Sequence, residues 1–250
     1  MADGDDWEQY SKPPITEAAV QFQLSSSLAQ SKVEKAAKKL AKFYEFSDEE
    51  HVTEFRLNAK TGKVEAGNPD WLGRKLNSKD RTDILLLRTN SLLFSRLAPY
   101  QGWSEFQARI ERDWEVWRKA TGASSISRVG MRYINRLDIP LGPDATVNVD
   151  HYLNVGPKFP DVGALAMTGF SMQVRRPLAA DELDLILNTG TVVPPPLVGN
   201  ASLTLDIDLS RSRDLPKGET ELWTLLNAMR SHKNRVFEAC ITPAARELFS

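Results

Sequence analysis

Hydrophobic and polar residues alternate along several short stretches of the chain, which is the pattern of a strand with one buried face. In residues 201–209, four aliphatic residues share one parity, whereas Thr204, Asp206 and Asp208 share the other. The alternation predicts strands over 17–24, 51–58, 128–140, 169–176, 182–193 and 201–209, and a hairpin over 83–97 that turns at Asn90 and Ser91. The Gly, Asn and Pro residues that follow position 58 predict a loop there.

Apolar residues recur every three or four positions in three other stretches, and this spacing places them on one face of an α-helix. It predicts helices over 28–44, 103–120 and 219–239, with a short helical turn near 151–153. Gly122 is expected to end the second helix. Thr242 and Pro243 are expected to be the N-cap and the first residue of a closing helical turn.

The order of these elements is strands, helix, strand, and then again strands and helix. It lacks the regular strand–helix alternation of a parallel sheet. We therefore predict an α+β fold, in which two similar strand-rich halves form antiparallel sheet packed against two long helices. Residues 1–11 are expected to be a flexible tail, and residues 12–250 a single domain with halves of approximately 12–145 and 146–250.

Composition and charge limit the class of protein. The 250 residues carry a net charge of -1, so no overall field attracts nucleic acid or an anionic membrane. Cys240 is the only cysteine, which excludes an intrachain disulfide and a cysteine-based zinc site. The chain shows neither a signal peptide nor an apolar run of about 20 residues. We therefore expect a cytoplasmic protein that has no membrane partner.

Common catalytic signatures are absent from the sequence. The chain contains neither a Gly-x-Ser-x-Gly elbow nor a His-Glu-x-x-His zinc motif. Gly62 and Gly67 have the spacing of a phosphate loop, but the Lys-Ser or Lys-Thr pair does not follow. We assign no catalytic residue, no cofactor and no metal. Asp206 and Asp208 are the candidates for holding a cation such as Mg²⁺, because both lie on one face of a predicted strand.

Three arginines on one predicted strand are the main candidate for a functional site. Arg128, Arg132 and Arg136 have the same parity and therefore line one face. Two interpretations are open: they pair with carboxylates such as Asp206 and Asp208 on a neighbouring strand, or they receive an anionic ligand. Three arginines and only two aspartates leave a surplus of positive charge, which favours the binding of an anionic ligand. The other candidate binding residues are Asn135, Arg175, Lys233 and Arg235.

The sequence contains four distinctive motifs, namely Lys12-Pro13-Pro14-Ile15-x-Glu17-Ala18, Arg132-Tyr133-Ile134-Asn135-Arg136, His151-Tyr152-Leu153-Asn154 and Lys233-Asn234-Arg235-x-Phe237-Glu238. With these motifs the chain resembles a family of bacterial proteins that is sporadically distributed and has no established activity. The resemblance spans nearly the whole chain and implies a single bacterial, cytoplasmic unit without implying a reaction. Sporadic occurrence is associated with mobile or defence-linked genes.

The leading hypothesis is a non-enzymatic interaction or ligand-binding protein in a bacterial defence or toxin–antitoxin module. Its arginine-bearing face would receive an acidic protein partner or a small anionic ligand. One alternative is a metal-dependent enzyme that acts on phosphate or phosphodiester bonds. Another is a nucleic-acid-binding protein that uses a stripe of lysines on the first predicted helix, namely Lys32, Lys35, Lys39 and Lys42.

Overall fold

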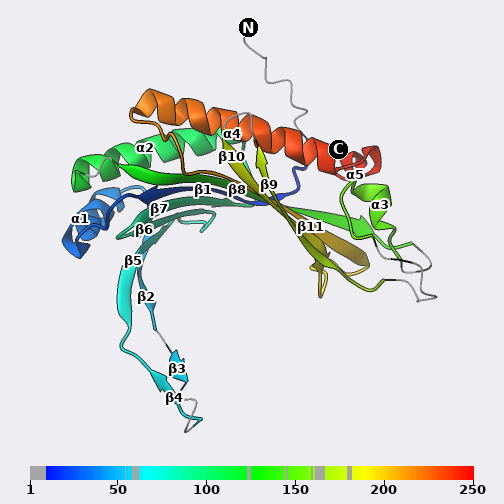
Figure 1. Cartoon of the computed structure of the whole chain (residues 1–250), viewed down its shortest axis with the longest axis horizontal. Helices are drawn as coiled ribbons and strands as arrows, with labels where there is room; N and C mark the ends of the chain where they lie inside the picture. Colours follow the sequence, from blue (N-terminus) through cyan, green and yellow to red (C-terminus); the bar gives the residue numbers. More distant parts are fainter. Residues whose placement is uncertain are drawn as a thin grey trace. The chain divides into compact units, whose positions relative to one another are not determined.

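The computed structural model describes residues 10–53, 55–57, 62–122, 125–142, 144, 146–158, 160, 167–178 and 182–250. Within these residues the chain has an α+β fold, with a nine-stranded antiparallel sheet, a two-stranded sheet and five helices (Figure 1). The strand order of the large sheet is β2-β5-β6-β7-β1-β8-β11-β10-β9. None of the helices that the described residues form is long and apolar enough to cross a membrane.

The first half of the chain contains β1 (Ile15–Leu24), α1 (Gln30–Leu40), β2 (Phe46–Val52), β3 (Phe55–Leu57), β4 (Val64–Ala66), β5 (Asp70–Asn77), β6 (Asp83–Arg88), β7 (Ser91–Leu97) and α2 (Trp103–Thr121). The second contains β8 (Ile126–Pro140), α3 (Val149–Tyr152), β9 (Ser171–Leu178), β10 (Leu183–Val192), β11 (Asn200–Arg211), α4 (Glu219–Cys240) and α5 (Pro243–Glu247). The helices predicted over 103–120 and 219–239 and the hairpin over 83–97 are confirmed.

The chain forms two compact units that are not consecutive in sequence. The N-terminal unit comprises residues 20–96 and 101–129, and the C-terminal unit comprises 1–19, 97–100 and 130–250. The predicted boundary near residue 145 falls inside the C-terminal unit. Strands β1 and β8 contribute residues to both units.

In the N-terminal unit, β5, β6 and β7 form an antiparallel meander, and α2 follows it along the chain. Helix α1 contacts α2, β5 and β6. The core is aromatic: the ring of Phe22 lies edge-on to Phe94 and to Trp114, with centroids 5.5 and 5.1 Å apart. The apolar stripe predicted for α2 is buried. Gly122 ends this helix with a positive φ of 67°, as expected.

In the C-terminal unit, β9, β10 and β11 form a second antiparallel meander, and α4 follows it. Helix α4 contacts β11, whose aliphatic residues at 203, 205, 207 and 209 are buried. The alternate residues of β11 therefore point to the opposite face of the sheet. The closing helix α5 begins at Pro243, and the hydroxyl of Thr242 accepts a hydrogen bond from the Ala245 N–H. The predicted N-cap is therefore confirmed.

The region between residues 46 and 77 differs from the prediction. The strand expected over 51–58 is divided between β2 and β3, and β4 and β5 occupy part of the expected loop. Gly73 explains why β5 was missed. A Cβ at this position would lie 2.1 Å from the Leu87 carbonyl oxygen, so the close approach of β6 requires glycine. From the sequence alone, the same glycine predicts a loop.

The N-terminal segment is only partly described. Residues 1–9 of the expected flexible tail lie outside the described residues. Tyr10 packs edge-on against Phe237 and Phe249, and its hydroxyl donates a 2.7 Å hydrogen bond to Glu238. Tyr10 is therefore fixed against the C-terminal helices of its unit.

Candidate anion-binding site

The three predicted arginines lie on β8, and each has a partner on the sheet. Arg132 donates from Nε and Nη2 to the two carboxylate oxygens of Asp206, at 2.8 Å each. Arg136 pairs with Asp138 on its own strand, with its Nη2 3.0 Å from a carboxylate oxygen. In the N-terminal unit, Arg128 Nη1 donates to the side-chain oxygen of Gln21 at 3.2 Å. Of the two interpretations, the cross-strand pairing is therefore present for Arg132.

The pair between Arg132 and Asp206 belongs to a longer chain of hydrogen bonds. The Asn188 amide donates to Asp206 at 2.9 Å, the Gln173 amide donates to Asn188 at 2.7 Å, and Arg175 Nε donates to Gln173 at 2.8 Å. The strand register places Asn188 opposite both Asp206 and Gln173. We call these five residues of β8, β11, β10 and β9 the polar ladder.

The sheet face that carries the polar ladder is not positively charged. Within the C-terminal unit this face holds three arginines, but carboxylates outnumber them. The surplus of positive charge that the arginines suggested is therefore absent. The arginines are Arg132, Arg136 and Arg175, and the carboxylates are Glu17, Asp138, Asp184, Asp206 and Asp208.

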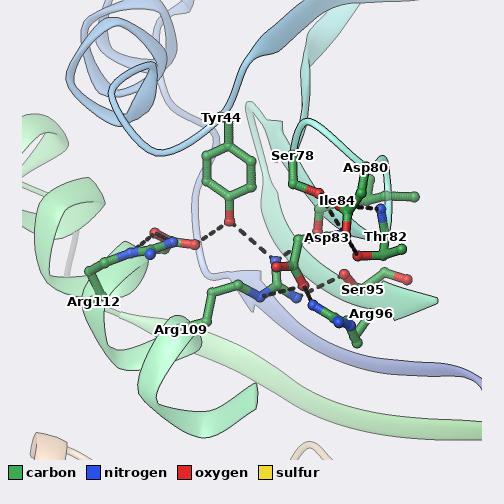
Figure 2. A network of polar contacts seen from close by, with 11 residues as sticks. Tyr44, Ser78, Asp80, Thr82, Asp83, Ile84, Ser95, Arg96, Arg109 and Arg112 are labelled. Carbon is green, nitrogen blue, oxygen red and sulfur yellow. Dashed lines mark hydrogen bonds and ion pairs between the residues drawn. The ribbon is translucent and has the colours of Figure 1, made fainter. Parts of the chain in front are cut away.

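A second group of arginines surrounds a pocket of about 420 Å³ in the N-terminal unit. It lies beside the first turns of α2, together with the end of β7 and the start of β6 (Figure 2). We call it the arginine pocket. Its lining residues are Asp83, Arg96, Gln101, Gly102, Glu105, Phe106, Ala108, Arg109 and Arg112.

Arg109 forms the fixed wall of the arginine pocket. Its side chain is only 8% exposed, and its Nε lies 3.2 Å from an oxygen of Asp83. Its Nη2 donates to the Ser95 carbonyl at 2.8 Å, and its Nη1 donates to the Tyr44 hydroxyl at 3.2 Å (Figure 2). A buried guanidinium needs several hydrogen-bond acceptors of this kind, because each N–H that loses its contact with water needs an acceptor within the protein.

Arg112 is held at the other side of the arginine pocket and is more accessible. Its Nε and Nη2 lie 2.9 and 2.8 Å from one carboxylate oxygen of Asp113, and the Tyr44 hydroxyl donates to the other oxygen. The guanidinium also lies 4.1 Å from the centroid of the Phe43 ring. Burial raises the pKa of the Asp113 carboxyl, and the hydrogen bonds from Tyr44 and Arg112 act in the opposite direction. Arg112 is therefore oriented by its ion pair with Asp113, while 39% of its side chain stays exposed.

The charges that line the arginine pocket favour an anion. Arg96 Nη1 and Arg109 Nε lie 3.1 and 3.2 Å from the same oxygen of Asp83, so two cations share one carboxylate. With Arg112 and Glu105, the lining carries three positive and two negative charges, and the Asp113 carboxylate behind the lining pairs with Arg112. The N-terminus of α2 also opens here, and its partial positive charge adds to the same field.

The remaining predicted residues lie elsewhere. Asn135 is buried and donates to the Leu205 carbonyl at 2.9 Å. Lys233 is buried on α4 with its Nζ 4.2 Å from the centroid of the Tyr133 ring, and Arg235 Nη2 lies 2.9 Å from His232 Nδ1. Of the predicted binding residues other than the three arginines, only Arg175 therefore belongs to the polar ladder.

The structure also shows where the residues lie that the nucleic-acid-binding and metal-dependent alternatives require. The four lysines of the predicted stripe are exposed on and just after α1. The Asp206 carboxylate is occupied by Arg132 and Asn188. No group of three or more His, Cys, Asp or Glu side chains in the described part of the chain is placed to hold a metal ion.

Sequence reading missed the arginine pocket, although one signal pointed to it. Arg109 and Asp113 lie four residues apart on the same helical face as Phe106 and Ile110. Charged residues at such core-facing positions are rarely buried unless they are paired. The position of Arg96 carried no such signal, because its contact with Asp83 depends on the pairing of β6 with β7.

Comparison with known proteins gives no further guide to the site. No protein-family model matches the chain, and a search of curated proteins returns no match. The bacterial family suggested by the sequence motifs therefore stays a prediction.

Proposed function

We propose that this protein is a non-enzymatic binding protein for a small anionic ligand and that the arginine pocket is its site. The observation that carries the proposal is the convergence of Arg96, Arg109 and Arg112 on one concavity. Two of these guanidiniums, those of Arg96 and Arg109, contact the same oxygen of Asp83.

The dimensions of the arginine pocket suit a small molecule. Its volume of about 420 Å³ lies within the range of about 300–1,000 Å³ that is usual for small-molecule sites. Arginine binds carboxylate and phosphate groups through a planar fork of N–H donors. The ring of Phe106 and the methyl group of Ala108 supply apolar lining. These features support a carboxylate- or phosphate-bearing metabolite as the ligand.

The arginine-bearing sheet face remains the alternative site, for a protein partner. Its guanidiniums are paired, and carboxylates outnumber them, so an acidic partner gains little from it. The assignment to a bacterial defence or toxin–antitoxin module rests on the sequence resemblance alone. Both ideas stay predictions, and variants of Arg132 and Arg112 separate the two sites.

The proposal can be tested by calorimetric titration and thermal unfolding with phosphate, sulfate, citrate and AMP. We expect at least one anion to bind and to raise the melting temperature, because a ligand at about 100 times its Kd stabilises the folded state by about 2.7 kcal/mol. Arg112→Gln should weaken binding about tenfold or more, since one charge-assisted hydrogen bond contributes roughly 1.5–3 kcal/mol. Glu105→Gln should strengthen binding, because it removes a negative charge from the lining.

Two matched variants serve as controls. Arg132→Gln removes an arginine from the polar ladder, and Lys119→Gln removes an exposed cation from the far end of α2. Neither should change anion binding. If no anion of the panel binds, or if Arg132→Gln weakens binding as much as Arg112→Gln does, the arginine pocket is not the site.

A further inference from the structure

The first turn of helix α2 brings a carboxylate to the arginine pocket that has no partner in the described residues. Glu105 lines the pocket and is exposed, and it forms no hydrogen bond or ion pair within the described part of the chain. A glutamate at the third position of a helix often accepts a hydrogen bond from the N–H of the N-cap residue, which here is Gly102. Because Glu105 makes no such bond, its carboxylate stays available to a ligand.

The first arginine of α2 does not neutralise Glu105. Arg109 follows Glu105 by four residues, which is the usual spacing of a helical ion pair. Its guanidinium instead contacts Asp83, the Ser95 carbonyl and the Tyr44 hydroxyl (Figure 2). The other carboxylate of the lining, that of Asp83, is in contact with two arginines. Glu105 is therefore the lining carboxylate that is left without a positive charge among the described residues.

Arg112 presents the opposite charge on the same stripe of the helix. Asp113 holds its Nε and Nη2, whereas its Nη1 forms no hydrogen bond within the residues that the structure describes. Glu105, Ala108 and Arg112 lie three and four residues apart, so they form one stripe of α2. Glu105 and Arg112 are separated by about 10 Å along the helix axis. The exposed methyl group of Ala108 therefore lies between one negative and one positive group of the pocket.

On the basis of the function proposed above, we propose that the ligand of the arginine pocket is an aliphatic amino acid whose ammonium and carboxylate groups are separated by a short methylene chain. The carboxylate binds the Nη1 side of Arg112, the methylene chain lies over Ala108, and the ammonium group binds Glu105. Both end contacts are charge-assisted hydrogen bonds. An anion without an ammonium group would place its charge near Glu105 with nothing to neutralise that carboxylate.

Calorimetric titration with matched pairs of ligands tests this assignment. The pairs are γ-aminobutyrate with butyrate, δ-aminovalerate with valerate and ε-aminocaproate with caproate, and the members of each pair differ only by the ammonium group. We expect at least one amino acid to bind about tenfold or more tightly than its partner, because a hydrogen bond between charged groups changes affinity by this factor. The chain length that binds best measures the separation of the two charges in the pocket.

Variants of α2 separate the ammonium contact from the rest of the site. Glu105→Gln should make an amino acid and its partner bind equally, and it should strengthen the binding of the simple carboxylate. Glu115→Gln removes an exposed carboxylate from the far end of α2 and should change neither affinity. Ala108→Leu should weaken both members of a pair, because the larger side chain occupies the path of the methylene chain.

The assignment of the ligand and the proposed function can fail separately. The assignment is overturned if the amino acids bind no more tightly than their partners, or if their advantage survives in Glu105→Gln. In that case the pocket is still an anion site if phosphate, sulfate, citrate or AMP binds and Arg112→Gln weakens this binding. If none of the amino acids, carboxylates and other anions binds, both proposals are wrong.

Discussion

Arg132 and Arg109 show how different two arginine–aspartate pairs of one protein are. Arg132 lies on an open sheet face with half of its side chain exposed, and its carboxylate partner is Asp206. Arg109 is 8% exposed and contacts Asp83 together with the Ser95 carbonyl and the Tyr44 hydroxyl. An exposed pair is screened by water, whereas a buried one must satisfy every N–H from within the protein. The degree of burial therefore decides how strongly each arginine–aspartate pair affects the stability of the protein.

Geometry adds a second difference between the two groups. Arginines at every fourth position of a strand are about 13 Å apart, because each residue rises about 3.3 Å. Arg128, Arg132 and Arg136 are therefore too widely spaced to surround one small anion. The arginines of the pocket come from the end of β7 and two successive turns of α2, so they reach one concavity. Regular spacing on a strand disperses charge, whereas the meeting of a hairpin and a helix concentrates it.

The largest expected effect comes from Arg109→Met. The substitution leaves the Asp83 carboxylate without one of its two cations and removes a donor from the Ser95 carbonyl. Removal of one partner from a buried pair typically costs about 3–5 kcal/mol. Urea unfolding should show a loss of this size. A loss below about 1 kcal/mol would mean that Arg109 is no better buried than Arg132.

Replacement of Lys233, a buried cation without a carboxylate partner in the described residues, should stabilise the folded protein, whereas replacement of Arg109 should destabilise it. Burial lowers the pKa of the Lys233 amine to about 7. Below pH 7, Lys233 is protonated in both the folded and the unfolded state, and the folded state bears the cost of burying the charge. Between pH 7 and about 10.4, only the unfolded state holds the proton, so stability rises with pH. Lys233→Met should remove this rise and stabilise the protein at pH 6 by roughly 1–4 kcal/mol.

The measurement for Lys233 is urea unfolding of both proteins across this pH range. The difference between the two curves isolates Lys233 from the other titrating groups. If the wild type and Lys233→Met show the same slope of stability against pH, the amine is not desolvated as the structure indicates.

The smallest effect is expected for Arg132→Gln. Half of the Arg132 side chain is exposed, so its pair with Asp206 should contribute less than about 1 kcal/mol and should weaken in high salt. Urea unfolding at low and high ionic strength measures both quantities. A loss comparable to that of Arg109→Met would show that the polar ladder stabilises the sheet as a cooperative unit.

The sequence by itself determined the elements whose signals are local. The alternation in 201–209, the apolar stripe of α2, the Asn90–Ser91 turn and the Thr242–Pro243 cap each act within a few residues, so they predicted β11, α2, the β6–β7 hairpin and α5. The face of β8 that carries the arginines was predictable for the same reason, since side chains alternate along any strand.

Tertiary structure alone decided which of these residues meet. Gly73 belongs to a strand because β6 approaches its backbone, and no local pattern contains that fact. Arg96 reaches Asp83 only after β6 pairs with β7, and Lys233 loses its water only after α4 packs against the sheet. Contact and burial depend on residues that lie far apart in the chain. The partners and charge states of the Arg96 and Lys233 side chains are therefore determined by tertiary packing.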